Sequence, residues 1–413
     1  MKFTDYRISP AIKKNLEDSG FKRPTDIQYK SIPPILNRED VLAIAQTGTG
    51  KTAAFAIPVL HMLDTKKEKD SSSVIRCLVM VPTRELAMQI EESFINLGKG
   101  TKVKIAAIVG GVSQDPQIKK LQEGVDIVIA TPGRLFDLTS QGHLKADKVE
   151  ILILDEADHM LDLGFIHDIR ALVQMIPARR QTLFFSATID DKIKKLAYSL
   201  VKKAIRIQIS PKNPVSKNVT HSVAFINMDD KRFFLERLIK EDPEKKTLVF
   251  VRTQVRAERV MKAMERVGIA TETIHGGKEQ EDRLTTMNRF RDGQNKILIA
   301  TDVSARGIDV SGVDQVVNYD LPDQVENYVH RVGRTGRGNN KGWAVSFCSD
   351  DEKPLLKEIE EYIGHPINQL EIKRNDYEET IDFSTDSKYD WKSLLEDDMK
   401  SNGKKKKKKR RNK

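Results

Sequence analysis

Short apolar runs alternate with longer amphipathic stretches along most of the chain. Each run holds three to five residues rich in Val, Ile, Leu and Ala, which is typical of strands buried in a parallel sheet. The stretches between the runs repeat apolar residues at helical spacing. The pattern predicts an α/β fold with mainly parallel sheets flanked by helices. Strands are expected at 41–45, 77–81, 105–109, 127–130, 151–154, 182–185, 247–251, 273–275, 297–300, 316–318 and 344–347, and helices at 51–63 (interrupted by Pro58), 85–97, 254–267, 279–291 and 351–362.

The alternation is interrupted once, at residues 210–219. This segment clusters Pro, Asn and Ser and has few apolar residues, a composition typical of a linker. We therefore predict two α/β domains, residues 1–209 and 220–368, joined by that linker. The length of 413 residues is compatible with two domains of this size.

The last stretch, 369–413, differs in composition from both domains. Residues 376–400 hold nine acids and three lysines, and residues 404–413 hold nine cations and no acid. So much like charge with so few apolar residues predicts a disordered tail, first acidic and then basic. We interpret the basic part as a loose tether for a polyanion such as nucleic acid. The alternative is a terminus that only improves solubility.

Composition excludes several other classes of protein. The chain has a net charge of +10 and is 39% hydrophobic, which is ordinary for a globular protein. Apolar runs reach only about five residues, far short of the roughly 20 that cross a bilayer. The first residues lack the apolar segment of a secretory signal, so we expect a cytoplasmic protein. Cys77 and Cys348 lie in apolar runs and are expected to be reduced core residues, which leaves a structural zinc site improbable.

A phosphate-binding loop is predicted directly after the first strand, from Ala45 to Thr52. Its glycines would let backbone N–H groups approach phosphate oxygens at the start of a helix, where the helix dipole also favours an anion. Lys51 would contact the outer phosphates and Thr52 would ligate Mg²⁺. Ala45 departs from the general pattern, which has Gly there, and a purely structural turn is the alternative. The predicted nucleotide-binding residues are Thr47, Gly48, Thr49, Gly50, Lys51 and Thr52.

Two acids follow the apolar run 151–154 without a gap. At the end of a strand, Asp155 could hold Mg²⁺ through water, and Glu156 could accept a proton from an attacking water. The alternative is a charged cap on the next helix, because acids suit a helix N-terminus. Together with the phosphate loop, the acids indicate a nucleotide with β- and γ-phosphates, bound with Mg²⁺.

These segments belong to a larger ordered set. Gly20-Phe-Lys-Arg-Pro-Thr-Asp-Ile-Gln28, Asp155-Glu-Ala-Asp158, Ser186-Ala-Thr188 and the segments 301–309 and 330–337 occur in the order and spacing of one family. Over residues 3–365 the chain resembles the bacterial DEAD-box ATP-dependent RNA helicases of superfamily 2. The resemblance implies two tandem RecA-like domains that bind ATP, Mg²⁺ and RNA.

The resemblance also implies roles for single residues. In the family, the counterpart of Phe21 stacks on adenine and that of Gln28 reads its edge, with Thr25 in the same motif. The counterparts of Ser186 and Thr188 couple hydrolysis to domain closure, with their hydroxyls directed toward the acids. Seen alone, the Ser/Thr pair could be an ordinary buried strand end.

In the second half, the resemblance assigns Arg334 and Arg337 as arginine fingers that neutralise charge on the γ-phosphate. Asp309 would contact the ribose, and His330 would link this motif to the Asp-Glu-Ala-Asp segment. A solvated arginine-rich face is the alternative for the motif alone. Because the fingers and Lys51 lie in different domains, hydrolysis is expected to require closure of the two domains over one nucleotide.

The RNA-binding residues implied by the resemblance follow several predicted strands. Hydroxyls, glycine N–H groups and arginines suit phosphate contacts, which carry no sequence information. Each segment alone could be ordinary turn chemistry. The residues are Pro82, Thr83, Arg84, Gly110, Gly111, Thr131, Arg134, Arg252, Thr253, His275, Gly276, Gln280, Arg283 and Thr301.

The combined prediction is an ATP-dependent RNA helicase that bends a bound strand and locally unwinds short duplexes, or remodels RNA–protein complexes, independently of RNA sequence. One alternative is a DNA-directed translocase of the same superfamily. Another is an ATP-gated RNA clamp or chaperone with little strand separation. We expect a monomer without membrane association, and ribosomal or RNA-decay proteins are possible partners.

Overall fold

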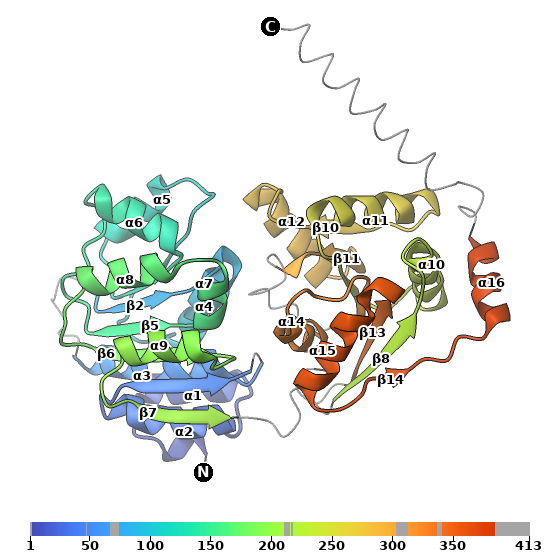
Figure 1. Ribbon diagram of the computed structural model, residues 1–413. Coiled ribbons are helices and arrows are strands. Elements are labelled where there is room, and N and C mark those ends of the chain that lie inside the picture. Colours follow the sequence, from blue (N-terminus) through green and yellow to red (C-terminus); the bar gives the residue numbers. More distant parts are fainter. Residues whose placement is uncertain are drawn as a thin grey trace, which may run out of the picture. The chain divides into compact units, whose positions relative to one another are not determined.

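The computed structural model describes residues 2–46, 48–66, 74–209, 215, 218–302, 313–336 and 341–384. The chain divides into two compact units between residues 214 and 215, and each unit is considered by itself (Figure 1). Three predicted site residues, Thr47, Asp309 and Arg337, lie outside the described residues. Most of the predicted linker and the basic segment 404–413 lie outside them as well.

The first unit is built on a seven-stranded sheet in the order β3-β4-β2-β5-β6-β1-β7, with parallel pairing between all neighbours. Helices lie on both sides of the strands (Figure 1). The strands are β1 (Val41–Ala45), β2 (Cys77–Met80), β3 (Ile105–Ile108), β4 (Ile127–Ala130), β5 (Ile151–Leu154), β6 (Gln181–Ser186) and β7 (Ile205–Ile209). The helices are η1 (Phe3–Asp5), α1 (Pro10–Asp18), α2 (Asp26–Leu36), α3 (Lys51–Lys66), α4 (Arg84–Leu97), α5 (Asp115–Gln122), α6 (Pro132–Ser140), α7 (Ala157–Asp162), α8 (Ile166–Met175) and α9 (Asp191–Leu200).

The second unit has its own seven-stranded parallel sheet, in the order β10-β11-β9-β12-β13-β8-β14. Numbered from its first strand, this is the same order as in the first unit. Its strands are β8 (Val219–Phe225), β9 (Thr247–Phe250), β10 (Glu272–Ile274), β11 (Ile297–Ala300), β12 (Gln315–Asn318), β13 (Gly342–Cys348) and β14 (Asn368–Gln369). Its described helices are α10 (Lys231–Glu241), α11 (Gln254–Arg266), α12 (Gln280–Arg291), α14 (Val325–Val332), η2 (Asp350–Glu352), α15 (Lys353–Ile363) and α16 (Arg374–Phe383).

Burial on both faces explains why the strands are apolar throughout. In β1, Val41 and Ala43 pack into one core with helices α1 to α4, whereas Leu42 and Ile44 pack into a second core with α6 to α9. Continuous apolar runs are what a parallel sheet covered by helices requires. The predicted fold class, two mainly parallel sheets flanked by helices, is confirmed. In such sheets ligands bind beyond the carboxyl ends of the strands, which directs attention to the loops there.

Helix α3 and strands β7 and β8 differ from the sequence predictions. Helix α3 continues through Pro58, whose missing N–H is outweighed by the burial of most side chains of this helix. Strand β7 was not predicted, because as an edge strand it buries only Ile207 well. Strand β8 begins at Val219, inside the predicted linker.

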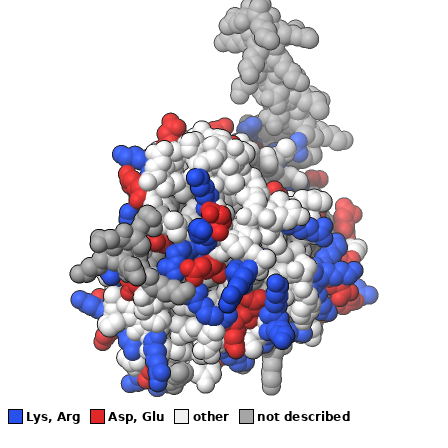
Figure 2. Space-filling model, turned by 90° about the vertical axis from the view of Figure 1, so that its left-hand side faces the viewer, with Lys and Arg blue, Asp and Glu red and all other residues white. Residues whose placement is uncertain are grey.

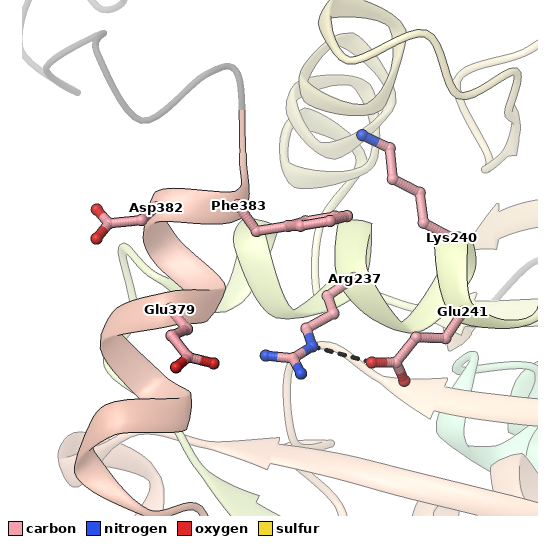
Figure 3. A pocket seen from close by; sticks show the side chains of 6 residues that line it. All are labelled: Arg237, Lys240, Glu241, Glu379, Asp382 and Phe383. Carbon is pink, nitrogen blue, oxygen red and sulfur yellow. Dashed lines mark hydrogen bonds and ion pairs between the residues drawn. The ribbon is translucent and has the colours of Figure 1, made fainter.

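Helix α16 lies within the segment 369–413 that the composition predicts to be disordered. It packs along α10, with the Tyr377 and Phe234 rings 4.8 Å apart and a 2.7 Å hydrogen bond from Arg237 Nη1 to Thr380 Oγ1. Figure 3 shows the pocket of about 500 Å³ between these helices. The packing of α16 on α10 stabilises a sequence too acidic to suggest a folded element by itself. The lining residues are Arg237, Lys240, Glu241, Glu379, Asp382 and Phe383.

Candidate functional site

The glycine-rich loop after β1 leads directly into α3. Gly48 and Gly50 have φ values of 81° and 90°, in the left-handed region that favours glycine. Lys51 is the first residue of α3, and its side chain is only 7% exposed. Its Nζ atom has no hydrogen-bond partner among the described residues. A buried ammonium group without a partner is unfavourable, so this arrangement favours an anion beside Lys51.

Asp155 follows β5 and is almost completely buried, with 2% exposure. Burial raises the pKa of Asp155 to about 6, although the positive charge of Lys51 acts in the opposite direction. The nearby carboxylates of Glu156 and Asp158 add to the rise. Three acids close together with one buried cation form a site that a further positive charge would stabilise.

Glu156 occupies an unusual backbone conformation directly after Asp155. Its φ of 51° lies in the left-handed region, which costs a residue with a side chain about 1–2 kcal/mol. Its Oε2 atom lies 3.4 Å from His159 Nδ1, and its N–H donates to Asp155 Oδ1 at 3.0 Å. Strain of this kind is often retained where the direction of a side chain matters for function.

The segment after β6 is tied to the acids by Asp158. Its Oδ2 accepts hydrogen bonds from the N–H groups of Ala187 and Thr188, both at 3.0 Å, and from Thr188 Oγ1 at 3.3 Å. Ser186 is fully buried and its Oγ has no partner among the described residues. Of the two predicted hydroxyls, Thr188 therefore contacts the acids and Ser186 does not. Asp158 was not predicted, although it is the fourth residue of the Asp-Glu-Ala-Asp segment.

The segment around Thr25 and Gln28 contacts the phosphate loop. Thr25 Oγ1 donates to the Thr49 carbonyl at 2.8 Å, and Gln28 Nε2 donates to the Gly50 carbonyl at 3.2 Å. A Cβ atom at Gly50 would lie 2.5 Å from Gln28 Nε2, so only glycine allows this approach. Phe21 is 38% exposed, and its ring packs edge-on against Phe3 with the centroids 6.1 Å apart. The start of helix α2 is thus joined to the phosphate loop by two hydrogen bonds.

Three predicted RNA-binding loops of the first unit meet at the carboxyl ends of β2, β3 and β4. Thr83 caps α4 by accepting a hydrogen bond from the Leu86 N–H at 3.3 Å. The Arg84 side chain lies so close to Gly111 that a Cβ there would be 1.8 Å from Nη1. Arg134 Nη2 donates to the Val112 carbonyl at 2.9 Å. Two arginines therefore converge on the loop after β3, where a Cβ at Gly110 would lie 3.5 Å from Arg84 Nη2. Pro82 and Thr131, which follow β2 and β4, are buried.

Several of the predicted RNA-binding residues of the second unit use their side chains in contacts within that unit. Arg252 forms ion pairs with Glu352 and Asp323, at 3.0 and 2.9 Å. Thr253 caps α11, accepting from the Arg256 N–H at 3.2 Å. Gly276 is exposed, whereas His275, Thr301 and Gln280 are buried. The side-chain oxygen of Gln280 accepts a hydrogen bond from Arg283 Nη1 at 3.3 Å.

The arginine-rich segment is anchored by a residue to which no role was assigned. Arg331 is 1% exposed and forms a bidentate ion pair with Asp302 at 2.6 and 2.7 Å. It also donates to the Asp320 carbonyl at 2.7 Å. Arg334 Nε donates to the His330 carbonyl at 3.2 Å, and the Arg334 side chain is 5% exposed. The sequence contained a sign of this structural role, because three arginines lie within seven residues and only two of them were assigned as arginine fingers.

On the face shown in Figure 2, acidic and basic side chains are interspersed in the lower part and along the edges, while much of the upper part is uncharged. No helix among the described residues is long and apolar enough to span a bilayer. Within the same part of the chain, no group of three or more His, Cys, Asp or Glu side chains could hold a metal alone.

Comparison with known proteins identifies both units. The family described as DEAD/DEAH box helicase matches residues 25–196, and the helicase conserved C-terminal domain matches residues 230–339. The chain is 38% identical to ATP-dependent RNA helicase DbpA of Bacillus subtilis (strain 168), over 89% of this chain and 76% of that protein. It is 42% identical to ATP-dependent RNA helicase RhlB of Shewanella sp. (strain W3-18-1), over 89% and 84%.

Solved structures agree over nearly the whole chain. Saccharomyces cerevisiae Dbp5 bound to RNA and ADP BeF3 matches with a TM-score of 0.82 and 30% identity, over 92% of this chain and 97% of that one. The DEAD-box helicase Mss116 bound to ssRNA and UDP-BeF matches with a TM-score of 0.82 and 29% identity, over 93% and 82%. The two units are thus tandem RecA-like domains. The chain belongs to the DEAD-box family and is an ATP-dependent RNA helicase.

Proposed function

We propose that the two units hold one ATP with Mg²⁺ and one RNA strand between them, and that hydrolysis proceeds only when both ligands are bound. The observation that carries this proposal is the buried Lys51 ammonium group beside the buried Asp155 carboxyl. A buried ammonium group without a hydrogen-bond partner among the described residues can bind phosphate oxygens. A buried carboxyl whose pKa is raised to about 6 is stabilised in its ionised form by a nearby positive charge such as Mg²⁺.

Thr52 and Asp155 are the residues that would hold Mg²⁺. One hydroxyl and one carboxylate leave coordination positions for phosphate oxygens and water, which is how proteins usually bind this ion. When bound, Mg²⁺ neutralises charge on the β- and γ-phosphates. Lys51 adds a second positive charge on the same side, while the amide groups of residues 48–50 orient the phosphates.

Glu156 serves as the base for the attacking water. Its backbone lies in the left-handed region directly after Asp155, and its Oε2 lies 3.4 Å from His159 Nδ1. Arg334 and Arg337 of the second unit stabilise the charge that develops on the γ-phosphate, an effect worth about 10³–10⁵ in rate in other phosphoryl-transfer enzymes. The separation of base and fingers into two units makes hydrolysis dependent on closure.

RNA binding to the loops after β2, β3 and β4 and to their counterparts in the second unit favours that closure. Contacts from hydroxyls, backbone amides and arginines to phosphates make binding independent of sequence. The hydrogen bonds from Ala187 and Thr188 to Asp158 link the strand end after β6 to the acids, a route by which hydrolysis releases the RNA. Bending of the bound strand then separates short duplexes.

The variant Glu156→Gln tests the assignment. We expect RNA-stimulated ATP hydrolysis to fall by at least about 10² because a general base is removed, while ATP and RNA still bind together. Glu92→Gln, at an exposed carboxylate of α4, is the matched control and should behave as wild type. Retained turnover in Glu156→Gln would reject Glu156 as the base.

A strand-displacement assay at saturating ATP tests the helicase step. Displacement of short RNA duplexes is the expected result. Tight ATP-dependent RNA binding without displacement would instead indicate a clamp or chaperone, and hydrolysis stimulated equally by DNA would indicate a DNA translocase. A monomeric state, action in the cytoplasm and association with ribosomal or RNA-decay proteins remain predictions.

A further inference from the structure

Both ring nitrogens of His275 are occupied by contacts within the second unit. Residue 275 directly follows β10, the edge strand of the sheet. Its Nε2 atom lies 2.8 Å from Glu258 Oε1, and its Nδ1 atom accepts a hydrogen bond from the Gly277 N–H at 3.2 Å. With Nδ1 accepting from the Gly277 N–H, Nε2 is the ring nitrogen that donates to Glu258.

Glu258 connects three elements through a single oxygen. It lies on α11, and its Oε1 accepts from Thr273 Oγ1 of β10 at 2.7 Å as well as from His275. Burial favours the protonated acid, but the hydrogen bonds from His275 and Thr273 and the charge of Lys278 hold the pKa of Glu258 below its ordinary value. The carboxylate is therefore ionised and accepts both hydrogen bonds, which are stronger for being charge-assisted.

The turn after His275 needs glycine for space and not for backbone conformation. Neither Gly276 nor Gly277 has a positive φ. A Cβ atom at Gly277, however, would lie 2.7 Å from Gln254 Oε1 and 3.3 Å from His275 Nδ1. The Gly277 N–H is used internally, whereas the N–H of the exposed Gly276 has no acceptor among the described residues. The turn thus leaves one backbone donor for an outside ligand.

We propose that Glu258 is a positioning residue for RNA binding, which holds the His275 ring so that the turn presents the Gly276 amide to an RNA phosphate. This inference rests on the proposed function, in which this loop is part of the RNA path. The imidazole itself does not contact RNA. The imidazole instead connects α11 to the turn through its two ring nitrogens. Glu258, to which the sequence analysis assigned no role, fixes the tautomer and the orientation of this ring.

The test compares RNA affinity in the presence of a non-hydrolysable ATP analogue for Glu258→Ala, Glu258→Gln and Glu265→Ala. Glu258→Ala should raise the Kd for RNA about tenfold, equivalent to ~1.4 kcal/mol. Glu258→Gln should stay near wild type, because its amide oxygen still accepts from the ring. Glu265 is an exposed acid on the same helix, so its alanine variant controls for charge and helix propensity. ATP binding without RNA should be unchanged throughout. Thermal unfolding should show every variant folded, with a lower midpoint for Glu258→Ala because the buried Thr273 hydroxyl loses its acceptor.

Two variants of His275 distinguish a ring that supports the turn from a ring that contacts RNA directly. The side-chain oxygen of His275→Asn can replace Nδ1 as the acceptor for Gly277, so this variant should bind RNA more tightly than His275→Ala. Nitrogen-edited NMR of the wild type should find the proton on Nε2, with and without RNA. The proposal is overturned if Glu258→Ala binds RNA as wild type does, or if His275→Asn loses as much affinity as His275→Ala. Absence of ATP-dependent RNA binding by the wild type would reject the proposed function itself.

Discussion

Replacement of Asp155 by Asn should stabilise the nucleotide-free protein while abolishing its Mg²⁺-dependent ATP binding. The pKa of Asp155 is raised from 3.8 to about 6, because the charged form is buried. At about 1.36 kcal/mol per unit, ionised Asp155 destabilises the first unit by roughly 3 kcal/mol at neutral pH. Asn has nearly the same shape, carries no charge, and its oxygen can still accept from the Glu156 N–H. We expect the variant to regain about 1–3 kcal/mol.

The sign of the pH dependence follows from the same shift. A carboxyl whose pKa is higher in the folded state favours folding when it is protonated. This stabilisation is fully present below pH ~4 and is lost as the pH rises through about 6. The wild type should therefore lose stability relative to Asp155→Asn between pH ~4 and ~7, whereas acid-induced effects elsewhere should affect both proteins equally.

Differential scanning calorimetry of nucleotide-free protein measures this difference, and titration calorimetry with ATP and Mg²⁺ measures binding. Asp147→Asn is the control, because Asp147 is exposed and its ion pair with Lys148 is long, at 4.0 Å. A variant Asp155→Asn that is less stable than wild type at neutral pH would refute the reasoning. Unchanged Mg²⁺-dependent ATP binding would refute the assignment of Asp155 as a metal ligand.

Three further predictions concern other parts of the chain. Gly111→Ala places a methyl group 1.8 Å from Arg84 Nη1 at a φ of 72°, so it should destabilise the first unit by about 1–2 kcal/mol in urea unfolding and weaken RNA binding. Lys231→Met removes the ammonium group 2.5 Å from the buried Glu352, which keeps its ion pair with Arg252 at 3.0 Å. The second unit should lose about 1–3 kcal/mol of stability, less than for a wholly unpaired buried charge, as followed by the fluorescence of Trp343 in a Trp391→Phe background, and unchanged stability would contradict this. Deletion of residues 404–413 should weaken RNA binding and reduce its salt dependence without affecting ATP binding in the absence of RNA, and an unchanged salt slope would reject the tether.

The sequence predicted the sheets because parallel strands buried on both faces must be apolar along their whole length. It predicted the phosphate loop and the acids because each is a set of consecutive residues at a strand end. Strand β7 and helix α16 were not predictable in this way, since one is an edge strand with polar residues and the other is an acidic helix stabilised by α10.

Contacts between distant segments were also out of reach. The bidentate pair of Arg331 with Asp302 and the hydrogen bond of His275 with Glu258 join residues 29 and 17 positions apart, with no local pattern that indicates either. Motif similarity marked His275 as a ligand for RNA, whereas the structure commits both of its ring nitrogens internally. Motif spacing indicates candidate loops for RNA binding, but not which of their atoms remain available for a ligand.

Energy transfer between the two units tests the central claim most directly. Cys77 and Cys348 are buried, so dyes on Glu123→Cys and Glu358→Cys, at exposed positions of the first and second unit, will label selectively. The account predicts a high-transfer state only when ATP and RNA are present together, lost again as ATP is hydrolysed and retained in Glu156→Gln. Transfer that stays the same with both ligands as with neither would contradict the proposal that one ATP is held by both units.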